Sequence, residues 1–148
     1  MKKSTPPLFH LAIPVRDLRA ARDFYGNLLG CAEGRSSDSW IDFDLGGHQL
    51  VCHLLPGQPR REPLTNPVDG DAVPVPHFGL VLDLAEWKAL AEKLAARGVE
   101  FAIAPHTRFA GTPGEQGTFF LYDPFDNALE FKGFSDLSRV FATGESNP

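Results

Sequence analysis

The sequence predicts an α+β protein built from two copies of a strand–helix–three-strand module. The first observation is an internal repeat, because residues 10–18 and 77–84 both read as a histidine, an apolar run, an aspartate and a leucine. The second is that each copy leads into a segment whose apolar residues recur at helical spacing. The third is that three short strand-like segments follow each predicted helix.

The first copy leads into a predicted helix that begins after Asp17 and ends at Gly30. Aspartate can cap the free N–H groups of a first helical turn, and glycine suits a helix end. Between them the apolar residues form a stripe at helical spacing: Leu18, Ala21, Tyr25 and Leu28. Strands are then predicted over residues 31–33, 40–44 and 49–54, with a tight turn at Gly46 and Gly47.

The second copy repeats this order. A helix is predicted from Leu84 to Gly98, with an apolar stripe that includes Trp87 and Leu94. Strands are predicted over residues 99–103, 118–122 and 128–134, and residues 123–127 form the turn before the last of them.

The remaining segments are predicted as connections. Residues 56–76 are rich in proline, glycine and charge, which indicates a loop with no third element. Residues 104–117 form a long polar loop of the kind that often covers a binding site. The predicted organisation is one domain over 1–148, with module one at about 8–55, the linker at 56–76, module two at about 77–134 and a tail at 135–148.

Composition and charge exclude several classes of protein. Hydrophobic residues make up 43% of the chain and charged residues 22%, which is typical of a folded domain and not of a disordered one. The net charge is −5 and the basic residues are scattered, so no nucleic acid is expected as a partner. No apolar run is long enough to span a bilayer, and no apolar leader follows the first lysines. Cys31 and Cys52 both lie in apolar surroundings, which favours reduced core thiols and a cytoplasmic location over a disulfide.

Strand alternation places the two repeated histidines on the face opposite the large apolar residues. His10 lies beside Ala12 and His77 beside Gly79, and these small neighbours leave room in front of each imidazole. In the last strand, Leu129 and Phe131 suit the face that packs on the helix, so Glu130 points the same way as the histidines.

These three side chains suggest a metal site. A carboxylate between two large apolar residues is costly to bury alone, and a bound cation would offset that cost. Two histidines and one carboxylate are a ligand set for Fe(II) that also suits Zn, Mn or Ni. The alternatives are hydrogen-bonded strand histidines and a surface carboxylate at Glu130. His53 is either a pocket residue or a satisfied polar group.

The layout resembles the vicinal oxygen chelate superfamily, which includes glyoxalase I, methylmalonyl-CoA epimerase, fosfomycin resistance proteins, bleomycin resistance proteins and extradiol dioxygenases. The resemblance runs from Phe9 to Phe134 and is most specific over residues 9–15, 23–30 and 120–131. It implies that the two βαβββ modules form a cup-shaped mixed sheet with the helices outside. It also implies a divalent metal held by His10, His77 and Glu130.

The resemblance leaves the reaction open. Glyoxalase I and the epimerases carry a fourth ligand where this chain has Val51, and His53 follows two residues later on the same face. Extradiol dioxygenases use three ligands, but Phe120 stands where their closing motif has a catalytic tyrosine. Bleomycin resistance proteins bind their drug without metal.

We therefore expect a divalent-metal-dependent enzyme that chelates two neighbouring oxygens of a small substrate and is dioxygenase-like by its ligand count. The alternatives are an isomerase or epimerase that uses His53 as acid or base, and a resistance protein that binds a ligand without catalysis. Candidate substrate-binding residues are Phe120, Tyr122 and Arg108. A homodimer is expected, in which the modules pair within one chain or between two.

Overall fold

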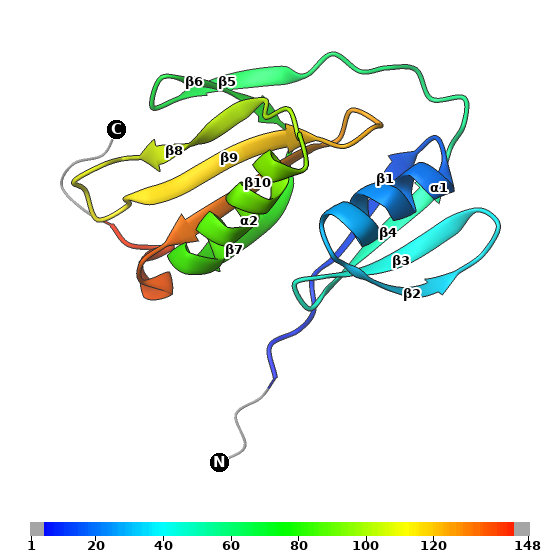
Figure 1. Cartoon of the computed structure of the whole chain (residues 1–148), viewed down its shortest axis with the longest axis horizontal. Helices are drawn as coiled ribbons and strands as arrows, with labels where there is room; N and C mark the ends of the chain where they lie inside the picture. Colours follow the sequence, from blue (N-terminus) through cyan, green and yellow to red (C-terminus); the bar gives the residue numbers. More distant parts are fainter. Residues whose placement is uncertain (1–4, 144–148) are drawn as a thin grey trace. The chain divides into compact units, whose positions relative to one another are not determined.

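The computed structural model describes residues 5–143 of the chain. The chain divides after Arg60 into two compact units, called unit 1 and unit 2 below. Each unit contains a four-stranded mixed sheet with a helix against it (Figure 1). This confirms the predicted α+β class and the two βαβββ modules.

Unit 1 contains the first module. Its sheet has the strand order β1-β4-β3-β2, in which β1 pairs with β4 in parallel and the other pairs are antiparallel. The elements are β1 (His10–Val15), α1 (Leu18–Ala21), η1 (Arg22–Leu28), β2 (Ala32–Ser36), β3 (Trp40–Leu45) and β4 (His48–Leu54).

The first predicted helix is confirmed in position, with a change of winding along its length. Asp17 caps it, because its carboxylate accepts a hydrogen bond of 3.0 Å from the Ala20 N–H. The α-helix α1 continues directly as the π-helix η1, which buries Phe24 and Tyr25. Gly30 follows with a φ of 76°, a left-handed conformation that glycine adopts without strain.

Unit 2 contains the second module, preceded by a hairpin. Its sheet has the order β7-β10-β9-β8, and β7 again pairs with the last strand in parallel. The elements are β5 (Leu64–Val68), β6 (Asp71–Val75), β7 (Phe78–Asp83), α2 (Leu84–Ala96), β8 (Ile103–Arg108), β9 (Gln116–Tyr122), β10 (Ala128–Phe134) and the short 3-10 helix η2 (Leu137–Arg139).

The prediction of a plain loop over residues 56–76 is wrong. Strands β5 and β6 form an antiparallel hairpin, joined by Asp69 and Gly70 at φ values of 44° and 85°. An Asp-Gly pair between two strands is a strong hairpin signal, but the prolines within both strands masked it. The hairpin lies beside β8 (Figure 1), and its Asp71 accepts a hydrogen bond from Arg108 of that strand.

The second-module strand predicted at residues 99–103 lies further along the chain in the structure. The strand β8 begins at Ile103 and runs to Arg108, so it occupies part of the predicted loop over residues 104–117. It pairs with β9 through a register shift between Ile103 and His106. The polar residues His106 and Arg108 do not give the apolar alternation on which strand prediction depends, which explains the displacement.

Helix α2 packs on the unit 2 sheet through Trp87. The indole N–H donates a hydrogen bond of 2.9 Å to the Phe131 carbonyl, and the ring lies against Phe119. Two glycines make room for this ring, since a Cβ at Gly133 would lie 2.6 Å from the Trp87 Cβ and one at Gly117 would lie 2.8 Å from the ring.

We expect Gly133→Ala to destabilise the protein by about 1–3 kcal/mol, the usual cost of overpacking a core. The nearest atom is the Trp87 Cβ, which the helix backbone holds in place and which cannot rotate away. The free energy of unfolding in urea measures the effect. Gly57→Ala is the matched control, because nothing lies within 4 Å of a Cβ there. Equal stability of the two variants would contradict this packing.

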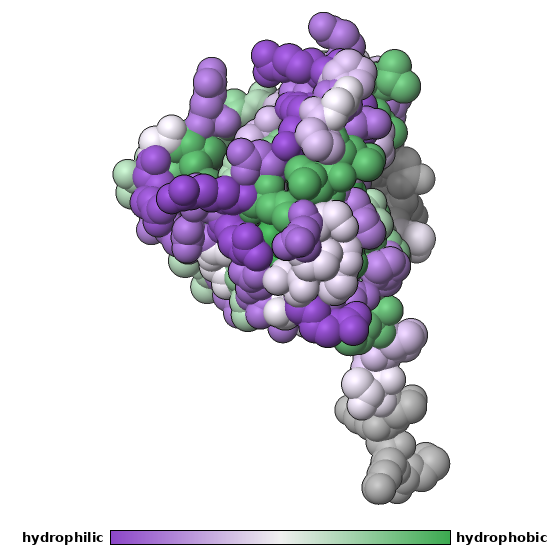
Figure 2. All heavy atoms as spheres, turned by 90° about the vertical axis from the view of Figure 1, so that its right-hand side faces the viewer, coloured by the Kyte–Doolittle hydropathy of each residue, from purple (hydrophilic) through white to green (hydrophobic). Residues whose placement is uncertain are grey.

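Several large apolar side chains are exposed, among them Leu8, Phe9, Leu64 and Phe141. Figure 2 shows hydrophilic residues over most of one face, with hydrophobic side chains gathered near its middle. Some exposed apolar residues are normal on a folded protein. Within residues 5–143, no helix is both long and apolar enough to cross a membrane.

Candidate metal centre

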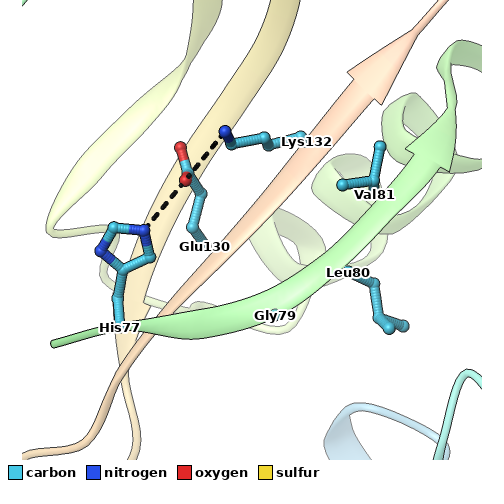
Figure 3. A pocket seen from close by; sticks show the side chains of 6 residues that line it. All are labelled: His77, Gly79, Leu80, Val81, Glu130 and Lys132. Carbon is cyan, nitrogen blue, oxygen red and sulfur yellow. Dashed lines mark ion pairs between the residues drawn. The ribbon is translucent and has the colours of Figure 1, made fainter. Parts of the chain in front are cut away.

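His77 and Glu130 meet in unit 2. Glu130 lies in the middle of β10 and His77 directly precedes β7, the strand that pairs with β10 in parallel. The His77 Nε2 lies 3.3 Å from the Glu130 Oε1, and Figure 3 shows the two side chains pointing toward each other. They line a pocket of about 170 Å³ together with Lys132. The sequence prediction that these two residues share a face is therefore matched by a direct contact.

The Glu130 carboxylate is almost fully buried and has partners on both oxygens. Its Oε2 accepts a hydrogen bond of 2.6 Å from the Thr118 hydroxyl, and the Arg108 Nη1 lies 3.4 Å away. The Lys132 Nζ lies 3.8 Å from its Oε1. The carboxylate is thus held from the Oε2 side, while Oε1 faces His77 and the pocket.

Electrostatics favour the charged forms of this pair. Burial raises the pKa of Glu130, but hydrogen bonds from His77 and Thr118, together with the charge of Lys132, lower it below its ordinary value. The pKa of His77 is raised, chiefly by its contact with Glu130 and against the effect of burial. A buried carboxylate that stays ionised is suited to hold a cation.

A network behind Glu130 connects the sheet to the β5–β6 hairpin. The Arg108 Nη2 donates a hydrogen bond of 2.9 Å to the Asp71 Oδ2, which also lies 2.9 Å from the His106 Nε2. These contacts place the Arg108 guanidinium between two carboxylates, Glu130 and Asp71, and its side chain is buried. The hairpin also contributes the Pro74 carbonyl, which lies 2.7 Å from the His77 Nδ1.

His10 stands at the equivalent place in unit 1, in a different polar setting. Its Nδ1 lies 2.8 Å from the Gln49 Oε1, and the Gln49 Nε2 donates a hydrogen bond of 3.2 Å to the Asp42 Oδ2. These three residues line a hollow of about 580 Å³ in unit 1, with Phe9 and Phe43 among its apolar walls.

Strand register identifies the residue that corresponds to Glu130 in unit 1. In unit 2, Glu130 pairs with Gly79, two residues after His77. In unit 1, Ala12 stands two residues after His10 and pairs with Val51. Val51 is buried and apolar, so the first module supplies no carboxylate at this position, as the resemblance to glyoxalase I and the epimerases had indicated.

The other predicted site residues lie as follows. His53 is exposed near the end of β4 in unit 1. Phe120 is completely buried beside Arg108 and His77, with ring centroids 5.1 Å apart in the pair with His77. Tyr122 is partly exposed at the end of β9. Their roles in catalysis and substrate binding stay predictions.

Among residues 5–143, no three His, Cys, Asp or Glu side chains are gathered closely enough to form a metal site. The structure brings together His77 and Glu130, both in unit 2. His10 belongs to unit 1.

The chemistry of the His77–Glu130 pair fits two ligands of a divalent ion. A carbonyl oxygen can only accept, so the contact with Pro74 requires the proton on the His77 Nδ1. In the neutral imidazole, the Nε2 lone pair then points at a carboxylate oxygen 3.3 Å away. Two lone-pair donors that face each other need a positive centre between them, which a proton or a metal ion provides.

Sequence reasoning missed the residues that surround the pair. Thr118 could have been predicted, because β9 pairs with β10, the strand of Glu130, and this pairing places Thr118 opposite Lys132. Asp71 and Pro74 lay in the segment interpreted as a loop. Gln49 and Asp42 carried no signal, since an amide and a carboxylate on neighbouring strands are common on exposed sheet faces.

Comparison with known proteins assigns the class. The family model described as the glyoxalase/bleomycin resistance protein/dioxygenase superfamily matches residues 8–131. The chain therefore belongs to the glyoxalase/bleomycin resistance protein/dioxygenase superfamily, the group that the sequence resembled. Comparison with curated proteins gave no significant match.

Solved structures support the same assignment. A glyoxalase/bleomycin resistance protein/dioxygenase from Alicyclobacillus acidocaldarius is 38% identical, with a TM-score of 0.75 over 90% of this chain and 96% of that one. The fosfomycin resistance protein FosX from Listeria monocytogenes shares the fold at 18% identity, with a TM-score of 0.67 over 93% of this chain and 100% of that one. A glyoxalase/dioxygenase from Nostoc punctiforme does so at 17% identity, with a TM-score of 0.65 over 92% and 99% of the two chains.

Proposed function

We propose that this protein is a divalent-metal-dependent enzyme that binds two neighbouring oxygens of a small substrate. The proposed ligands are His10, His77 and Glu130. The observation that carries the proposal is the 3.3 Å approach of the His77 Nε2 to the Glu130 Oε1, with the Nδ1 proton directed to the Pro74 carbonyl. Membership of the superfamily and the repeated position of His10 in the first module support it.

The residues of the chain have separate tasks in this centre. His77 and Glu130 would hold the ion, while Thr118 and Arg108 fix the Glu130 carboxylate from the side of its second oxygen. Lys132 balances charge at the pocket. When bound, a divalent ion acts as a Lewis acid that stabilises negative charge developing on substrate oxygens. Phe120, Tyr122 and Arg108 remain the proposed substrate-binding residues.

The proposal predicts about one divalent ion per chain. Protein purified without chelators should contain Fe, Zn, Mn or Ni by elemental analysis, because two histidines and a carboxylate suit these ions. Chelator-treated protein should take the ion up again in a titration with Zn²⁺ or, without oxygen, Fe²⁺. Failure to bind any of the four ions above background would overturn the proposal.

A second candidate function is an isomerase or epimerase that uses His53. The supporting observation is that His53 is exposed on β4 in unit 1, two residues from the position equivalent to Glu130. An exposed imidazole is accessible to a substrate and can act on it as a general acid or base. Uptake of dissolved oxygen by the metal-loaded protein, tested with vicinal diols and hydroxyketones, favours the dioxygenase. Turnover without oxygen that is lost in His53→Ala, with metal retained, favours the isomerase.

A further inference from the structure

We infer that Gln49 and Asp42 are positioning residues that fix the tautomer of His10, so that His10 presents its Nε2 to a metal ion. This inference rests on the proposed function for the ion itself, but the tautomer can be measured without it. A chain of hydrogen bonds runs from Asp42 through Gln49 to His10.

Asp42 sets the orientation of Gln49. A carboxylate oxygen accepts hydrogen bonds and has no proton to donate. The Gln49 amide atom that lies 3.2 Å from the Asp42 Oδ2 must therefore be its nitrogen. Asp42 is buried, and the Arg35 Nε lies 3.8 Å from the same oxygen. The Gln49 amide is thus fixed with its oxygen directed away from Asp42.

Gln49 in turn sets the tautomer of His10. The Gln49 oxygen lies 2.8 Å from the His10 Nδ1, and an amide oxygen accepts only. The His10 Nδ1 must therefore carry the proton and donate it. In the neutral ring the lone pair is then at Nε2, the atom that a metal ion would bind.

The same tautomer is reached in unit 2 by a different route. There the Pro74 carbonyl accepts from the His77 Nδ1 at 2.7 Å, and the carbonyl comes from the hairpin that precedes β7. No hairpin of this kind lies between residues 5 and 9, the described segment before β1. The amide of Gln49, opposite His10 in the strand register, serves in its place. The two histidines of the repeat thus have the same tautomer, although the acceptors that impose it are unrelated. This indicates that both sites require an unprotonated Nε2.

The test compares Gln49→Leu with Gln58→Leu in the full chain. Gln49→Leu removes the acceptor, while Gln58→Leu makes the same change at an exposed turn of the same unit. The His10 tautomer is read from the imidazole ¹⁵N shifts of chelator-treated protein above pH 8, and Zn²⁺ affinity is read by competition with a chromogenic chelator. Asp42→Asn is a second variant, because it keeps Gln49 but removes the group that orients it.

In Gln49→Leu, we expect the His10 proton to move largely to Nε2, the tautomer that an isolated imidazole prefers. Zn²⁺ affinity should fall about 10- to 100-fold, as is usual when the partner of a metal-binding histidine is removed. Asp42→Asn should give a mixture of tautomers and a smaller loss. Gln58→Leu should match the parent protein in both measurements, and the thermal midpoints should stay close together.

Three results would overturn the inference. They are a His10 tautomer with Nε2 protonated in the parent protein, an unchanged tautomer in Gln49→Leu, and a changed tautomer with unchanged Zn²⁺ affinity. Failure of the proposed function would differ from these, because Zn²⁺ affinity would then be insensitive to His10→Ala as well.

Discussion

Glu130→Gln is expected to lower the affinity for the divalent ion by more than about 100-fold, the upper end of the loss seen when only an outer partner of a ligand is removed. The substitution keeps the shape of the side chain but removes the charge that His77 and Lys132 face. Elemental analysis and Zn²⁺ competition measure the result. Any turnover that depends on the proposed ion should be lost in parallel.

Glu100→Gln is the matched control for this prediction. It makes the same chemical change in unit 2 at an exposed position outside the strands, and it should leave metal content unchanged. The Thr118 hydroxyl can donate to the new amide oxygen, so the fold should persist in Glu130→Gln. A Glu130→Gln protein that holds the ion as tightly as its parent would show that this carboxylate is not a ligand.

Arg108→Met is expected to destabilise the protein by about 3 kcal/mol, at the lower end of the range for breaking a buried ion pair. The side chain of Arg108 is only 4% exposed, and its loss leaves the equally buried Glu130 without its guanidinium partner. Thr118 and His77 retain their contacts with Glu130, which limits the cost. The free energy of unfolding in urea gives the value.

A double-mutant cycle separates the charge effect from lost packing. Arg108→Met combined with Glu130→Gln removes both charges, so the double variant should recover at least about 1 kcal/mol relative to the sum of the single changes. Arg139→Met is the control for the arginine, because its pair with Asp136 is exposed and worth little. Strict additivity of the two buried changes would contradict coupling through this ion pair.

The fold was predictable because its two modules repeat. The apolar stripes of the helices and the positions of β3, β4, β9 and β10 follow from periodicity, and the structure confirms them closely. The predicted position of β8 was wrong because buried polar residues such as Arg108 interrupt the apolar alternation on which strand prediction depends. The β5–β6 hairpin was missed because prolines in both strands outweighed the Asp69–Gly70 turn signal.

The site was predictable only at the level of single positions. Alternation and repetition placed His77 and Glu130 on one face, and the structure shows them in contact. The groups that orient these two side chains reach the site through pairing between strands and through the β5–β6 hairpin. The periodicity of a single sequence does not predict either of these. Arg108 illustrates the difference, since its charge was evident in the sequence while its position between Glu130 and Asp71 was not.

The Pro74 carbonyl has a consequence for how the two modules tolerate mutation. A peptide oxygen persists whatever side chain occupies position 74, so no point mutation deletes the acceptor of the His77 proton. The acceptor for His10 is a side chain, and it is oriented by another side chain. Saturation mutagenesis scored by metal retention should therefore find positions 42 and 49 intolerant, and position 74 permissive wherever the hairpin still forms.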